Sequence, residues 1–85
     1  MAVYSTPEPF LQVTVESHVY TRDAEEIGVV KEIRGRALKI RAGLFRQFWV
    51  RADAVAAAVP DISVVLVASK DQLENYKVKE PPAAA

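Results

Sequence analysis

The chain has 85 residues, of which 51% are hydrophobic and 26% charged, and its 11 basic and 11 acidic side chains leave no formal net charge. This length fits a single small domain, and this composition is typical of a folded protein and excludes a disordered one. Because the sequence has no cysteine, it excludes disulfides, thiol catalysis and thiolate metal sites, and it fits a reducing cytoplasm.

The opening residues contain Pro7 and Pro9, so we expect residues 1–10 to be a flexible N-terminal segment. They lack the basic and long apolar regions of a signal peptide, and nowhere does the sequence reach the roughly 18 apolar residues of a membrane span. We therefore expect a cytoplasmic protein without membrane insertion.

Residues 11–76 are predicted to form one domain of short strands separated by turns. Extended or alternating apolar runs indicate strands, listed in chain order: 10–15, 17–23, 27–34, 37–42, 45–52 and 62–68. The alanine-rich residues 52–59 predict a short helix that ends at Pro60. The capping-box spacing of Ser69 and Gln72 predicts a short C-terminal helix. Residues 77–85 are expected to be a disordered tail.

Many short strands with few helical residues predict an all-β fold, either a small closed antiparallel β-barrel or a strongly bent sheet, and we take the barrel as the expected fold. The run IGVVKEI adds a detail, because Ile27, Val30 and Ile33 recur at every third position. A flat strand cannot place all three on one side, so we expect a β-bulge near Gly28.

Charge is distributed unevenly along the chain. Residues 1–30 carry a net charge of −4, residues 31–51 one of +6, and residues 52–85 one of −2. We take the basic segment as a candidate interaction surface, which consists of Arg34, Arg36, Lys39, Arg41, Arg46, Trp49 and Arg51.

This surface has two alternative interpretations. It could bind phosphates, with Trp49 or Phe48 as a stacking platform for bases. It could instead be the outward face of ordinary strands, whose cations are solvated or paired with acidic residues of the same chain. Nucleic-acid-binding domains typically have a pI above about 9. The pI of this sequence, about 6.6, is well below that.

Phe48 and Trp49 are adjacent in a predicted strand, so they point to opposite faces and one of them should be partly exposed. An exposed aromatic beside arginines is typical of protein interfaces. The alternative is that the 52–59 helix or the C-terminal segment covers it.

Nothing in the sequence predicts catalysis. His18 is the single histidine and has no cysteine beside it with which to bind a metal, and Glu25 and Glu26 fall in a predicted turn where carboxylates are usually solvated. Phosphate-binding and nucleophile motifs are absent from the sequence. We expect no enzyme activity, no cofactor and no metal.

The order of these features resembles the PRC-barrel family across residues 17–76. The matching positions are Ile27, Gly28, Val30 and Ile33, then Leu38, Ile40, Val50, Val55, Val64 and Leu66. That family includes a barrel domain of the photosynthetic reaction-centre H subunit, one of a bacterial ribosome maturation factor, and small stand-alone bacterial proteins of unknown function. The resemblance implies a non-enzymatic interaction or assembly module, and the small core favours self-association as a homodimer or another homo-oligomer, or binding to another protein. An RNA- or ribosome-associated module that uses basic strands 31–51 is the alternative.

Overall fold

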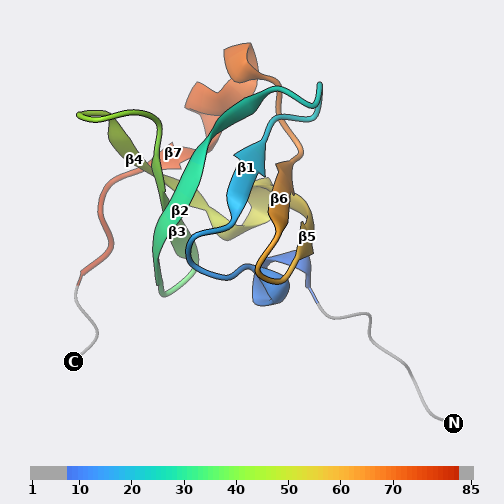
Figure 1. The fold of residues 1–85 in the computed structure, drawn as a ribbon. Coiled ribbons are helices and arrows are strands. Elements are labelled where there is room, and N and C mark those ends of the chain that lie inside the picture. Colours follow the sequence, from blue (N-terminus) through green and yellow to red (C-terminus); the bar gives the residue numbers. More distant parts are fainter. Residues whose placement is uncertain (1–7, 83–85) are drawn as a thin grey trace, which may run out of the picture.

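The structure is a computed structural model that describes residues 8–82 of the chain. Its strands form one seven-stranded sheet in the order β5-β6-β1-β2-β3-β4-β7 (Figure 1). The elements are, in chain order, η1 (Pro9–Gln12), β1 (His18–Tyr20), β2 (Glu26–Arg34), β3 (Ala37–Arg41), β4 (Gln47–Arg51), η2 (Ala52–Ala54), β5 (Val55–Val59), β6 (Ser63–Leu66), η3 (Lys70–Tyr76) and β7 (Lys77–Val78). The three elements labelled η are 3₁₀ helices.

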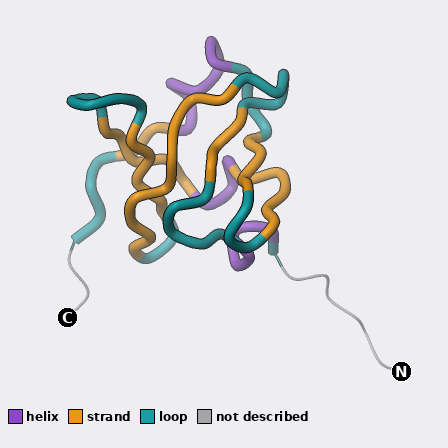
Figure 2. The backbone as a smooth tube through the Cα atoms, in the orientation of Figure 1, coloured by secondary structure: helices purple, strands orange, loops and turns teal. Residues whose placement is uncertain are grey.

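The prediction of a closed antiparallel barrel is wrong. The sheet is open, because β5 and β7 form its two edges and do not pair with each other. It is also mixed, since β1 and β6 run parallel, with His18 opposite Ser63. In Figure 2 the strands curl around a common interior. The helical turns η1 and η3 lie at opposite open ends of this curl, which are distinct from the two edge strands. Core residues from η1 and η3 complete the interior in place of a closing strand pair.

The predicted bulge in β2 is confirmed. The pairing of β1 with β2 shifts register between Val19 and Tyr20, which leaves Ile27 as an extra residue beside Gly28. A second shift, in the pairing with β3, leaves Lys31 unmatched. These bulges change the alternation of the strand, so Val30 is fully buried while Ile27 and Ile33 pack against the same core.

The core combines one face of the sheet with residues from the helical turns. The fully buried side chains Leu38, Ile40, Val50 and Leu66 lie on β3, β4 and β6. Phe10 of η1 and Leu73 of η3 belong to the same buried cluster. η1 and η3 lie at opposite ends of the curled sheet (Figure 1), so each covers one end of the interior.

The predicted helix at residues 52–59 is also wrong. Only Ala52–Ala54 are helical, as a single 3₁₀ turn, and Val55–Val59 form β5. Pro60 and Asp61 do not simply end a helix but turn the chain into a hairpin, in which the Ile62 N–H donates to the Val59 carbonyl at 3.0 Å. Asp61 has φ of +66°, as a type II turn with proline at its second position requires. Pairing with the apolar strand β6 outweighs the helix propensity of alanine.

A short helical segment does follow Ser69, where η3 begins at Lys70. The Ser69 N–H donates to Gln72 Oε1 at 3.2 Å, as the capping-box spacing predicts. The ordered chain then continues past the predicted domain boundary, because Lys77 and Val78 form β7 and pair with β4. The expected flexible segment and tail fall partly on residues 1–7 and 83–85, which lie outside the described residues.

Candidate interaction surfaces

Strand register brings four residues into one row on the outer face of the sheet, the face opposite the core. Glu32 of β2 pairs with Lys39 of β3, which pairs with Trp49 of β4, which in turn pairs with Val78 of β7. Their core-facing counterparts in the same strands are Ile33, Leu38 and Val50. The sequence alternation thus separates the aliphatic residues from the charged ones as expected.

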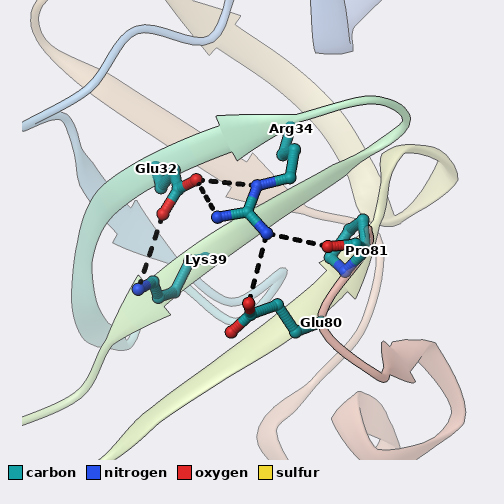
Figure 3. Close-up of polar contacts among 5 residues, drawn as sticks. All are labelled: Glu32, Arg34, Lys39, Glu80 and Pro81. Atoms are coloured by element: carbon teal, nitrogen blue, oxygen red, sulfur yellow. Dashed lines mark hydrogen bonds and ion pairs between the residues drawn. The ribbon is translucent and has the colours of Figure 1, made fainter. Parts of the chain in front are cut away.

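Arg34 is the centre of a polar network on this outer face (Figure 3). Its Nε donates to Glu32 Oε2 at 2.9 Å, and its Nη1 donates to Glu80 Oε2 at 3.2 Å and to the Pro81 carbonyl at 2.7 Å. Lys39 Nζ lies 3.6 Å from the other oxygen of Glu32. The network therefore ties β2 and β3 to the C-terminal segment.

The same two cations cover Trp49. The Arg34 guanidinium lies 5.1 Å from the centroid of the indole ring, and Lys39 Nζ lies 5.7 Å from it. Trp49 is 6% exposed although it lies outside the main hydrophobic core. Cations above an aromatic face are attracted by the ring quadrupole, so Trp49 stabilises the position of both side chains and presents no open surface.

Phe48 points to the core side, as alternation from Trp49 requires, and is half-buried against the core cluster. Lys77 Nζ lies 4.7 Å from its ring centroid. Of the two covering segments expected for the aromatic pair, the C-terminal one lies over Phe48, whereas Val55–Val59 form an edge strand elsewhere in the sheet.

Lys31 Nζ of β2 lies 3.1 Å from Glu16 Oε1, and two further paired cations lie at the Gly35 turn and at the end of β4. Arg36 donates through Nη1 to Glu8 Oε2 at 2.6 Å, and its guanidinium lies over the ring of Phe10. Arg51 Nε donates to Asp53 Oδ1 at 2.8 Å. Five of the seven basic residues in 31–51 thus have a carboxylate partner, and these are Lys31, Arg34, Arg36, Lys39 and Arg51.

Ion pairing shifts the titration of two of these carboxylates. The hydrogen bond from Arg36 lowers the pKa of Glu8, and the hydrogen bond from Arg34 lowers the pKa of Glu32. The pKa values of Arg34 and Arg36 are raised in turn by the same bonds. Both pairs are consequently ionised at neutral pH, and much of the positive charge of the segment is neutralised within the chain.

Arg41 and Arg46 differ from the other cations of the segment. Among residues 8–82, neither lies within ion-pair distance of a carboxylate, and Arg41 Nε donates instead to the Gly43 carbonyl at 3.0 Å. They flank the tip of the β3–β4 hairpin, where Leu44 is 76% and Phe45 94% exposed. This tip is the part of the candidate surface that combines free positive charge with exposed apolar groups.

A cavity of about 440 Å³ lies between this hairpin and η3. Its apolar lining includes Ile27, Phe48 and Leu73, and its charged lining includes Arg46 and Lys70. This volume falls in the range of small-molecule sites. Across the described part of the chain, no group of three or more metal-ligating side chains is placed to hold a metal ion.

Sequence reasoning missed the apolar surface around β5. Val59 of β5, Ile62 of the following turn, Leu11 of η1 and Val15 after η1 are all exposed large hydrophobic residues. The hairpin signal, Pro60-Asp61 between two apolar runs, was present in the sequence. The exposure could not be inferred, because it depends on which strand lies at the sheet edge.

Within residues 8–82, no helix is long and apolar enough to cross a bilayer. Comparison of the chain with models of protein families, with curated proteins and with solved structures found no match.

Proposed function

We propose that this chain is a non-enzymatic protein-interaction module that assembles with copies of itself. The observation that carries the proposal is the set of large hydrophobic side chains at its surface, which consists of Leu11, Val15, Leu44, Phe45, Val59, Ile62 and Val78. Exposed apolar residues that gather in patches are typical of interaction sites, whereas single ones need no explanation. Six of these seven residues of the described chain gather at two places, near the β5–β6 hairpin and at the β3–β4 hairpin tip, while Val78 lies in β7.

The size of the chain supports the same proposal. A domain of this length buries only about 60–65% of the surface of its unfolded chain, and association is one way to bury more. The open sheet leaves two edges for partners, which a closed barrel would not.

The alternative of RNA binding through residues 31–51 has less support. Five of the seven cations are paired with carboxylates of the same chain, and Trp49 is covered and cannot stack on a base. Within residues 8–82, only Arg41 and Arg46 among these cations would be available to phosphates without breaking an ion pair, and two contacts give weak binding with a small salt dependence.

Sedimentation velocity across a wide range of protein concentration tests the proposal. We expect the weight-average mass to rise toward that of a dimer or higher oligomer as concentration increases. A monomer at every concentration would contradict self-assembly. A parallel assay with mixed single-stranded RNA at low salt is expected to show no binding, and binding that weakens steeply with salt would favour the RNA-associated alternative.

A further inference from the structure

We infer that the outer edge of β5 is the surface through which two copies associate, by antiparallel pairing of this strand with its own copy. The inference rests on the proposed self-association and adds the surface and the geometry. An edge strand presents unpaired N–H and C=O groups that a second strand can satisfy. Among residues 8–82, the backbone of residues 56–58 has no backbone hydrogen-bond partner outside the β5–β6 ladder.

The two edges of the sheet differ in how they are protected. β7 has only two residues, Lys77 and Val78, and Lys79 follows directly. Short length and lysines are features by which natural sheets prevent edge-to-edge pairing. β5 has five residues with the sequence VAAAV and no charged side chain, so it lacks both of these features.

The side chains of β5 also suit close approach of a second copy. A register shift at Ala56 places Val55 and Ala58 toward the core, while Ala57 and Val59 are exposed. Small outward groups leave the strand edge open, and the absence of charge means that two copies meet without like-charge repulsion. The strand is therefore compatible with a twofold interface in which the same residues contribute from both copies.

Exposed apolar residues lie on the β5–β6 hairpin and on the segments that contact it. η1, which carries Leu11, packs against β5. The Asp61 N–H of the β5–β6 turn donates to Thr14 Oγ1 at 2.7 Å, which ties the turn that carries exposed Ile62 to the segment that carries exposed Val15. Four of the seven exposed large hydrophobic residues among 8–82 thus lie on the β5–β6 hairpin or on segments in contact with it, and a second copy on this edge would cover Val59 of β5 in addition to forming strand hydrogen bonds.

The test is an edge substitution with matched controls, read by sedimentation velocity of the full chain. Ala57→Lys places a charge on the proposed interface without entering the core. It is expected to raise the dissociation constant of the dimer by about tenfold or more. Val78→Lys makes the same type of change at the other edge, and Phe45→Ser removes the apolar hairpin tip. Both controls are expected to leave the dimer unchanged, with circular dichroism confirming that each variant is folded.

The outcomes separate the inference from the proposed function. A monomeric wild-type protein overturns both. A wild-type dimer that Ala57→Lys leaves intact overturns the inference alone, and loss of the dimer in Phe45→Ser assigns the interface to the hairpin tip instead. Should Ala57→Lys fail to fold, hydrogen exchange of the wild-type protein decides: amides of residues 56–59 must become more protected as concentration rises, and unchanged protection refutes the edge.

Discussion

Replacement of Gly28 by alanine should be the most damaging small substitution in the sheet. Gly28 lies in β2 where this strand approaches β3. An added Cβ would overlap the backbone carbonyl oxygen of Arg41 and would lie 2.9 Å from its carbonyl carbon and 3.0 Å from Ile40 Cγ2. Two of these three atoms belong to the backbone, so no side-chain rotation can relieve the overlap.

The size of the effect follows from this geometry. Overpacking by one methyl group costs about 1–3 kcal/mol where side chains can adjust, and here a central strand must move, so we expect a loss of about 3 kcal/mol. A chain of this length has a free energy of unfolding of roughly 4–13 kcal/mol in total. The corresponding decrease in Tm is about 12–24 °C.

Urea unfolding monitored by the fluorescence of the single tryptophan, Trp49, measures this loss directly. Gly35→Ala is the matched control, because Gly35 has φ of +58° but no atom within 4 Å of an added Cβ. That substitution should cost only the strain of a left-handed alanine, about 1–2 kcal/mol. If Gly28→Ala is no more destabilising than Gly35→Ala, the argument from the close approach of β2 and β3 is wrong.

Three further predictions concern the ends of the chain and its ion pairs. Leu73→Ala should lower the free energy of unfolding by about 2–5 kcal/mol in the same urea assay, because Leu73 is 6% exposed within the core cluster; a loss below 1 kcal/mol would mean that η3 does not cover the core. Arg34→Ala should shift Trp49 emission to longer wavelength, because it removes a cation from the ring and two contacts to the C-terminal segment; an unchanged spectrum would contradict this role. The pKa values of Glu8 and Glu32 are lowered in the folded protein, so the stability that they contribute is present above the ordinary carboxyl pKa of about 4.3 and is lost as the pH falls through the lower folded values. Glu32→Gln should therefore flatten the decrease of Tm with acidification, and a profile identical to that of the wild-type protein would exclude a contribution from this pair.

The sequence predicts the β2–β3–β4 region well, because these strands pair with their neighbours in the chain and are therefore determined by nearby residues. The run IGVVKEIR begins one residue after β2 does, and ALKIRA matches β3 to within one residue. The threefold spacing of Ile27, Val30 and Ile33 correctly predicts the bulge, since it is incompatible with a flat strand. Adjacent strands joined by a short turn require only local contacts, and alternation then fixes which side chains enter the core.

The rest of the fold depends on partners that a local pattern does not identify. Residues 52–59 have the composition of a helix, and only pairing with β6 makes Val55–Val59 a strand. The antiparallel barrel fails for the same reason, because nothing in β1 indicates that its second neighbour is the parallel strand β6. Arg36 pairs with Glu8, and Arg34 pairs with Glu80 in addition to Glu32. Glu8 and Glu80 lie in segments that the sequence suggests are flexible, so these two ion pairs could not be predicted.

The parallel pairing of β1 with β6 has a consequence for the order in which the protein folds. His18 and Ser63 come from distant parts of the chain, so joining them requires a long loop to close before any contact compensates for the lost entropy. The meander of β2, β3 and β4 needs no such closure and can form first, as the nucleus onto which β6 docks. Substitutions in the meander should then slow refolding, whereas Val64→Ala in β6 should mainly accelerate unfolding, a distinction that stopped-flow kinetics resolves.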